Sequence, residues 1–281
     1  MYIGAHLKKE SGSLLKTIKL IQDNGGNSLQ LFVSNPRSIQ NANIQNYTDI
    51  ADDVKKYCKD NNFKLIIHAP YTINLAKDLR NEKRIIEFKD AYWINVLISN
   101  LKVSDIIGSI GVVVHVGKFT TNTKENGLKN MFESIKYIIN VMHKEKISSK
   151  LIIETPAGVG TELLTSVNEF IDFYNKFNEN DKQKIGICLD TAHIWSSGYD
   201  INEYYKEISK TNGKDITVIH YNNSKKDKGS KVDVHENIFD GKMKIQDMKQ
   251  FVLNLKHNPM IILEKPSDDI KKDFDFIKTN T

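Results

Sequence analysis

Eight short apolar runs recur along this chain, and each is continuous rather than alternating with polar residues. Continuous runs are typical of strands that are covered on both faces, as in a parallel sheet. They predict strands at residues 2–7, 28–33, 64–70, 111–117, 151–157, 185–193, 216–222 and 260–266. Parallel strands need a long crossover between each pair, so helices are expected in the intervening segments.

Those intervening segments are amphipathic and too long for hairpins. They predict helices over residues 13–24, 46–61, 81–105, 125–147, 162–179, 200–211 and 244–256, and a last one over 268–279. Eight strand–helix pairs predict an α/β fold, the (β/α)8 TIM barrel, as a single domain of residues 1–281. A doubly wound open sheet is the alternative. Against it, no Gly-rich dinucleotide fingerprint follows the first run and no GxxxxGK[ST] loop occurs, so no nucleotide cofactor is expected.

Composition sets broader limits. The 281 residues contain no linker-like stretch and suit one barrel domain. The net charge of +5 permits a polyanionic partner without requiring one. Cys58 and Cys188 are too few for a disulfide scaffold. No apolar run approaches membrane-spanning length and residues 1–10 lack the layout of a signal peptide, so we expect an intracellular, cytoplasmic protein that contacts no membrane.

Nine side chains of metal-binding types stand at the ends of six of these runs or in the loops after them. They are His68, His115, Glu154, Asp190, His193, His220, Asp233, His235 and Glu264. In a barrel the carboxyl ends of all strands meet at one face, where barrel enzymes keep their active sites. Burying several carboxylates there without cations would be very costly, so the pattern predicts a metal site.

The ligand types indicate which metals and how many. Imidazole and carboxylate without thiolate suit zinc and tolerate manganese or iron. Nine ligands exceed the needs of one tetrahedral ion, and three ions fit if one carboxylate bridges two of them. Closely spaced ions generate a nucleophile at neutral pH and stabilise attacking and leaving oxygens, which is the usual device for hydrolysing phosphodiesters.

Six motifs carry a resemblance to a known family. They are YIGAH at 2–6, ETPAG at 154–158, GICLDTAH at 186–193, HYNNSK at 220–225, GSKVDVH at 229–235 and IILEKP at 261–266. In these motifs, and over essentially its whole length, the chain resembles the endonuclease IV family of apurinic/apyrimidinic (AP) endonucleases, which are xylose isomerase-like TIM barrels.

The resemblance implies a site of three zinc ions with Glu154 shared. His68, His115 and Glu154 would hold the first ion; Glu154, Asp190, His220 and Glu264 the second; His193, Asp233 and His235 the third. It implies a zinc-dependent hydrolase, acting as a monomer in DNA repair, with Glu154 and Glu264 as the catalytic carboxylates. A hydroxide bridging the first two ions would cleave the phosphodiester 5′ to an abasic site in duplex DNA, leaving a 3′-hydroxyl and a 5′-deoxyribose phosphate. The resemblance also implies a 3′-end cleaning activity.

DNA contacts follow from the same resemblance. Arg37 and Tyr71 match positions that enter the DNA stack and help to flip the abasic nucleotide out, and Lys231 stands in a DNA-binding loop. The sequence departs from the family at Thr72, where a bulky apolar residue is usual, and at Lys231 and Val234, where arginines are usual. Nearby lysines would compensate in part as phosphate contacts, namely Lys225, Lys226 and Lys228.

Two other functions remain open. A sugar isomerase or epimerase on the same barrel would use Glu154, Asp190, His220 and Glu264 with one metal. Such an enzyme has no need for the other five ligands. A non-catalytic binder of damaged DNA would show missing ligands, whereas the full set is present.

Overall fold

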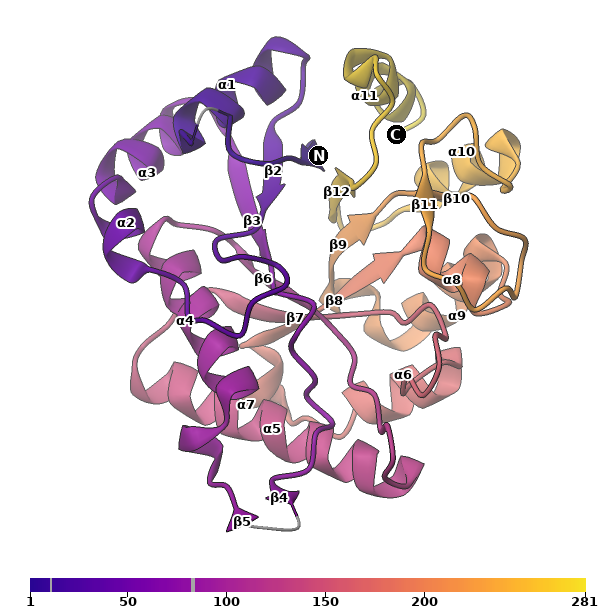
Figure 1. Ribbon diagram of the computed structural model, residues 1–281. Coiled ribbons are helices and arrows are strands. Elements are labelled where there is room, and N and C mark those ends of the chain that lie inside the picture. Colours follow the sequence, from indigo (N-terminus) through magenta and orange to yellow (C-terminus); the bar gives the residue numbers. More distant parts are fainter. Residues whose placement is uncertain (11, 82–83) are drawn as a thin grey trace.

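The computed structural model describes residues 1–10, 12–81 and 84–281 and contains a closed barrel of eight parallel strands (Figure 1). The strands are β1 (Ile3–His6), β2 (Ser28–Leu31), β3 (Lys64–His68), β6 (Gly111–His115), β7 (Lys150–Glu154), β8 (Ile185–Asp190), β9 (Ile216–His220) and β12 (Met260–Leu263). Strand β1 pairs with both β2 and β12, which closes the barrel. The predicted TIM barrel is therefore confirmed, and the open sheet is excluded.

Helices surround the barrel. The longer ones are α1 (Leu14–Asp23), α3 (Ala51–Asp60), α4 (Tyr92–Ile106), α5 (Lys124–Lys144), α6 (Val167–Tyr174), α9 (Ile201–Asn212), α10 (Ile245–Asn254) and α11 (Ile270–Thr279). Side-chain caps satisfy free backbone N–H groups where several of them begin, as at Thr123 before α5 and Ser166 before α6. Helix α5 then buries Ile135, Ile138 and Met142 toward the strands, at the spacing of one helical face.

The prediction of one helix over 81–105 is wrong in its first half. Residues 82–83 lie outside the described part of the chain. Around them β4 (Arg80–Asn81) pairs with β5 (Arg84–Ile85), and a 3-10 turn, η1 (Phe88–Asp90), precedes α4. Ile86 and Phe88 pack against the core whereas Ile85 is exposed, an alternation of period two that favours extended chain over helix.

Three other predicted segments are shorter or broken. The 46–61 stretch is divided into α2 (Ile44–Thr48) and α3, and within 162–179 the helices are α6 and the start of α7 (Glu179–Lys182). The 185–193 run leaves the sheet at Asp190, because the Asp190 side chain accepts a hydrogen bond from the His193 backbone N–H and begins α8 (Thr191–Ser196).

The barrel interior is filled by a small apolar plug. Its seven residues are Ile66, Val113, Ile152, Cys188, Val218, Met260 and Ile262, each at most 3% exposed. Successive strand residues point to opposite faces, so the residue two positions further along points into the barrel as well. For six of the seven plug residues that next inward residue is one of the nine predicted ligands. The apolar plug therefore lies directly beneath six of the predicted ligands in the barrel.

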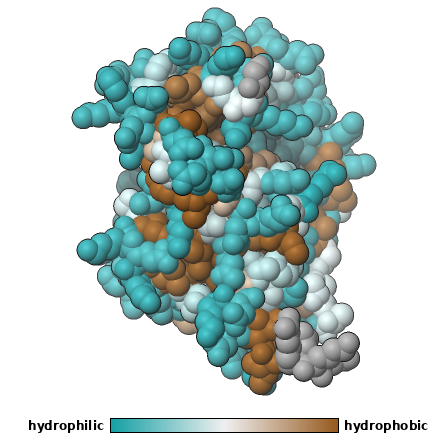
Figure 2. Space-filling view, turned by 60° about the vertical axis from the view of Figure 1, so that its left-hand side comes forward, coloured by the Kyte–Doolittle hydropathy of each residue, from teal (hydrophilic) through white to brown (hydrophobic). Residues whose placement is uncertain are grey.

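The outer surface is mainly polar. Figure 2 shows hydrophilic side chains over most of the face that it displays, with separate apolar patches between them. Scattered apolar side chains are normal on folded proteins. Among the helices of the described residues, we find none with the length and apolar character that crossing a membrane requires. Both cysteines are free, with Cys188 buried in the plug.

Candidate metal centre

The nine predicted ligands converge at the carboxyl ends of the strands. Parallel register sets His115 on β6 beside Glu154 on β7, and Asp190 on β8 beside His220 on β9. His193 is brought in by α8, His235 by β11 (His235–Glu236), and Asp233 by the loop before β11. Glu264 directly follows β12.

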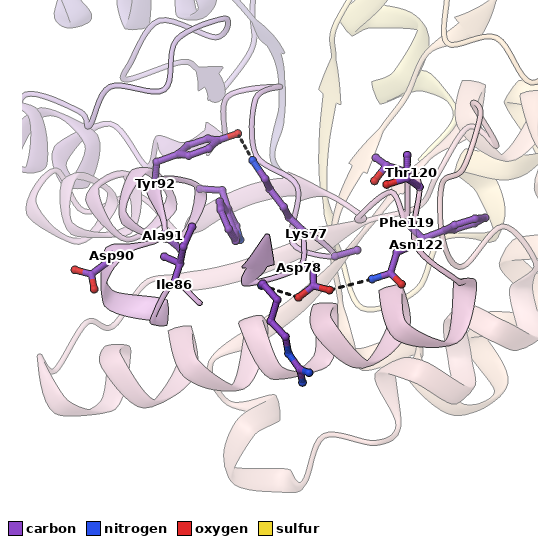
Figure 3. Close-up of a pocket in the computed structure, with 13 residues that line it drawn as sticks. Lys77, Asp78, Ile86, Asp90, Ala91, Tyr92, Phe119, Thr120 and Asn122 are labelled. Atoms are coloured by element: carbon purple, nitrogen blue, oxygen red, sulfur yellow. Dashed lines mark hydrogen bonds between the residues drawn. The ribbon is translucent and has the colours of Figure 1, made fainter. Parts of the chain in front are cut away.

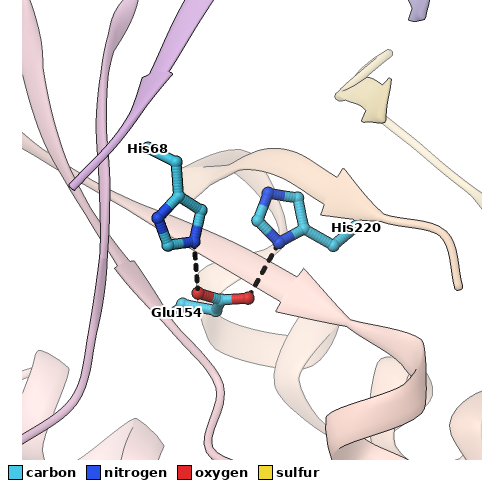
Figure 4. A group of neighbouring side chains, drawn as sticks. All are labelled: His68, Glu154 and His220. Carbon is cyan, nitrogen blue, oxygen red and sulfur yellow. Dashed lines mark hydrogen bonds and ion pairs between the residues drawn. The ribbon is translucent and has the colours of Figure 1, made fainter. Parts of the chain in front are cut away.

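Glu154 lies between two sets of imidazoles. Its Oε2 is 3.5 Å from His68 Nε2 and 3.3 Å from His115 Nε2. Its Oε1 is 2.8 Å from His220 Nδ1, on the other side (Figure 4). The side chain is 1% exposed, so both oxygens are directed at these partners rather than at water. This is the geometry expected of a carboxylate shared by two metal ions.

A second group surrounds His220. One ligand atom from each of Glu154, Asp190, His220 and Glu264 lies within 4.8 Å of the others. His220 Nδ1 is 3.3 Å from Glu264 Oε2 and 3.7 Å from Asp190 Oδ2. This group coincides with the ligand set that the family resemblance gives to the second ion.

A third group lies over α8, and its membership differs in part from the family pattern. His193 Nε2 and His235 Nε2 are 3.1 Å and 3.2 Å from Asp233 Oδ1. His235 Nε2 is also 3.5 Å from Asp190 Oδ2, and the compact set in the structure is Asp190, His193 and His235. Asp233 is 37% exposed and approaches from the solvent side. In the same way, the compact set at Glu154 contains His68 and His220, whereas His115 contacts it from one side.

Three buried polar atoms in this cluster lie 3.1–3.5 Å from another side chain of the cluster but in a geometry that makes no hydrogen bond: Glu154 Oε2, His193 Nε2 and His235 Nε2. A buried polar atom without a partner costs about 1–3 kcal/mol. Two of the imidazoles are anchored through their other nitrogen, since His68 Nδ1 lies 2.8 Å from the Ala69 carbonyl and His193 Nδ1 lies 2.8 Å from the Thr155 carbonyl. One anchored and one free nitrogen is the usual state of a metal-binding histidine. The residues present therefore fit a centre of metal ions.

The pKa values of the cluster residues reflect two opposing effects, which are burial and the attraction between carboxylates and imidazoles. Burial alone would raise the pKa of Glu154, but His115 and His220 lower that pKa well below its usual range. Burial would lower the pKa of His235, but Asp190 and Asp233 raise it to about 9. His235 therefore holds a proton at neutral pH that an incoming cation must displace, so metal binding at this side chain releases a proton.

The predicted DNA-contact residues flank the mouth of the barrel. Tyr71 is 60% exposed, and its ring centroid lies 5.8 Å from those of His68 and His115. Arg37 is exposed in the preceding β2 loop. Two hydrogen bonds tie these loops together: Tyr71 N–H donates to Pro36 O at 2.9 Å, and Thr72 Oγ1 donates to Ser38 O at 2.7 Å.

Lys231 is exposed on the opposite side of the mouth. Its backbone N–H donates to Ser196 O of α8 at 3.0 Å, which holds the 225–231 loop over the third ligand group.

Sequence reasoning missed two buried amides, Gln30 and Asn222. Asn222 Nδ2 donates to Asp190 Oδ2 at 2.9 Å and to Glu264 Oε2 at 3.1 Å. Gln30 contacts both His220 and Glu264. The available signal was position, because both residues stand at strand ends, in line with the ligands. His6 also lies beside this group, with Nδ1 3.7 Å from Glu264 Oε1.

Two cavities open onto this cluster. One of about 450 Å³ is lined by His68, Tyr71, His115, Asp233, His235, Glu264 and Lys265, and one of about 520 Å³ extends past His6 and Phe32. A larger cavity of about 640 Å³ lies between the β3–α4 and β6–α5 loops (Figure 3). Along its wall Lys77 Nζ donates a hydrogen bond to the Tyr92 hydroxyl, and Asn122 Nδ2 donates one to Asp78 Oδ2. None of the nine ligands lines this cavity.

Comparison with known proteins places this geometry in a family. A sequence model of the xylose isomerase-like TIM barrel family matches residues 18–280. The "Probable endonuclease 4" of Mesomycoplasma hyopneumoniae strain J is 31% identical over 280 residues, spanning 97% of this chain and 95% of the relative. The chain belongs to the endonuclease IV family.

Other relatives extend the comparison. The "Apurinic-apyrimidinic endonuclease 1" of Plasmodium berghei is 29% identical over 97% of this chain and 52% of the relative. The endonuclease IV structure from Thermus thermophilus superposes with a TM-score of 0.74 at 21% identity, covering 100% of this chain and 98% of that one. A D-tagatose 3-epimerase-like protein also gives 0.74, at 17% identity, covering 100% and 97%. At these identities the structural matches show the shared barrel alone.

Proposed function

We propose that this chain is an AP endonuclease of DNA repair that hydrolyses the phosphodiester 5′ to abasic sites in duplex DNA, leaving a 3′-hydroxyl and a 5′-deoxyribose phosphate. The observation that carries the proposal is the arrangement of Glu154 between imidazoles on two sides, with a further imidazole–carboxylate group beyond Asp190. Relatives named as endonuclease 4 and AP endonuclease support the same reaction.

We assign three zinc ions to the centre. The first would be held by His68, His115 and Glu154, the second by Glu154, Asp190, His220 and Glu264, and the third by His193, Asp233 and His235. Such ions supply a water-derived nucleophile and neutralise charge on the attacking and leaving oxygens. Glu154 and Glu264 would be the catalytic carboxylates, because each lies beside more than one imidazole of the centre.

The chain's own residues bind and place the DNA in this proposal. Tyr71 presents an exposed ring directly above His68 and His115, where it would pack against the nucleotides beside the lesion. Arg37 would enter the duplex from the same side, and Lys231 would contact phosphate across the mouth. A nucleotide without a base loses little stacking when it is flipped out, which favours abasic sites over intact DNA. The protein would act as a monomer, and 3′-end cleaning would use the same centre.

An epimerase remains the second candidate, because Glu154, Asp190, His220 and Glu264 by themselves form a compact ligand set that could hold one metal ion. The buried Nε2 atoms of His193 and His235, which face Asp233 without making a hydrogen bond, argue against it. An epimerase with a single metal ion would not need these two side chains as ligands.

A direct assay separates the two candidates. Zinc-loaded protein is expected to incise a labelled duplex at a single internal abasic site, and the upstream fragment should prime synthesis because it ends in a 3′-hydroxyl. The undamaged duplex of the same sequence is the control, with ketohexose epimerisation measured in parallel. An intact abasic duplex would refute the proposed function, and sugar turnover in its place would establish the epimerase.

Arg37→Ala is expected to weaken binding of abasic duplex by about tenfold, or about 1.4 kcal/mol, while the metal content stays the same. Arg37 is exposed on the loop that the Tyr71 and Thr72 hydrogen bonds hold beside the centre, but it contacts none of the nine ligands. The matched control is Lys56→Ala, which removes an exposed cation from the outer helix α3. Binding is measured by fluorescence anisotropy and zinc by elemental analysis. Loss of zinc from the Arg37 variant would contradict the assignment.

A further inference from the structure

Gln30 is a fully buried amide at the end of β2, in line with the ligands of the other strands. Its exposed fraction is 0%, and Ser28, two residues earlier on the same inward face, is buried to the same degree. The last inward-facing residue of β2 is this amide, one position before the strand ends at Leu31, whereas β3, β6, β7, β8 and β9 end in a histidine or a carboxylate. A buried amide at that position needs partners for both its oxygen and its nitrogen.

The Gln30 side chain finds three such partners. Its Oε1 lies 2.8 Å from His220 Nε2. Its Nε2 lies 3.0 Å from Glu264 Oε1 and 3.0 Å from His6 Nδ1. The amide group has an acceptor oxygen and two donor hydrogens, so this arrangement uses both hydrogens of the nitrogen and gives the oxygen one partner.

The chemistry of Glu264 decides which way round the amide must lie. A carboxylate only accepts hydrogen bonds, so the NH2 group of Gln30 must face Glu264 Oε1. The amide oxygen then necessarily faces His220 Nε2, which must carry a hydrogen to donate. With its hydrogen on Nε2, a neutral His220 has its lone pair on Nδ1, the atom that faces Glu154, Asp190 and Glu264.

We propose that Gln30 is a positioning residue of the metal centre: it selects Nδ1 as the ligand atom of His220 and holds Glu264 in place. This inference rests on the proposed metal site and adds a relay to it, running from the Glu264 carboxylate through the Gln30 amide to the His220 ring. Asn222 supports the other oxygen of Glu264, Oε2, at 3.1 Å, but it makes no contact with His220 Nε2. The tautomer of His220 therefore depends on Gln30.

The test is zinc affinity measured by competition with a chromophoric chelator, without DNA. Gln30→Met keeps the length of the side chain and removes both hydrogen-bonding groups. It is expected to lower affinity at the weakened site by about 10- to 100-fold, the usual effect of losing a residue that orients a metal ligand. Asn100→Leu is the matched control, because Asn100 is also a 0% exposed amide but bonds to Val96 O and Ser34, away from the ligands. The control should bind zinc like the wild type.

A second readout follows the imidazole directly. Nitrogen NMR of 15N-histidine-labelled, zinc-loaded protein is expected to show His220 coordinated through Nδ1 in the wild type and to lose that single state in Gln30→Met. Gln30→Glu keeps an acceptor for His220 but sets a second carboxylate against Glu264, so it should retain Nδ1 coordination while zinc affinity falls. This variant decides the matter if the methionine variant does not fold, as checked by circular dichroism.

Wild-type zinc affinity in a folded Gln30→Met or Gln30→Glu variant would overturn the proposal, as would coordination of wild-type His220 through Nε2. These outcomes are separate from the fate of the proposed function. A wild-type protein that binds zinc through His220 Nδ1 yet leaves abasic duplex intact would refute the endonuclease and leave the role of Gln30 standing.

Discussion

Glu154→Gln should reduce incision of an abasic duplex by more than about 100-fold, the upper end of what is lost when a residue behind a metal ligand is removed. The side chain is 1% exposed, and its two oxygens face His68 and His115 on one side and His220 on the other. An amide carries no charge and would turn its NH2 group toward one of these sides. Both neighbouring ions would then lose an anionic ligand at once. Single-turnover cleavage at saturating enzyme measures the effect on the chemical step.

The control for this substitution is Asp181→Asn. Asp181 is also a buried carboxylate, at 4% exposure, but it pairs with Lys136 and caps the short helix α7 before β8, at the end of the barrel away from the ligands. Its variant is expected to lose stability while keeping normal cleavage and zinc content. Normal cleavage by Glu154→Gln would show that Glu154 does not bridge two ions.

Removing the metal should abolish cleavage and also destabilise the fold. The nine ligands include four carboxylates, and Glu154 Oε2 is buried without a hydrogen bond. An ion that binds only the folded state adds about 4 kcal/mol when its concentration is about 1,000 times its dissociation constant. Dialysis against a chelator is therefore expected to lower the melting temperature clearly, and added zinc should restore both stability and activity.

Counting the ions completes this experiment. We expect close to three zinc ions per chain after mild desalting, and manganese or iron should replace some of them with altered activity. A chain that retains fewer than two ions, or whose melting temperature is unchanged by the chelator, would contradict the proposed cluster. Magnesium is the useful negative control, because it prefers oxygen ligands to imidazole.

The sequence predicts the barrel well because its strongest signal, continuous apolar runs, depends on burial that every parallel strand shares. The convergence of His68, His115 and Glu154 follows from the same signal, because the carboxyl ends of all the barrel strands lie at the mouth of the barrel. Apolar runs do not predict the side-chain contacts that form only when the barrel closes. Gln30 meets His220 across 190 residues of sequence, and no local pattern marks that contact. The hairpin of β4 and β5 is not predicted either, because a short amphipathic stretch fits the period of a helix and that of a strand equally well.

Thr72 has a consequence for how the protein would meet DNA. Its hydroxyl joins the Arg37 loop to the Tyr71 loop through Ser38 O, in a place where the family usually has a bulkier apolar side chain. Two loops that are hydrogen-bonded to each other lose conformational entropy when the chain folds. That entropy cost is then not incurred again when the protein binds DNA. In the proposed complex this preorganisation would offset the smaller side chain of Thr72, because Arg37 and Tyr71 would approach the abasic site as one rigid unit.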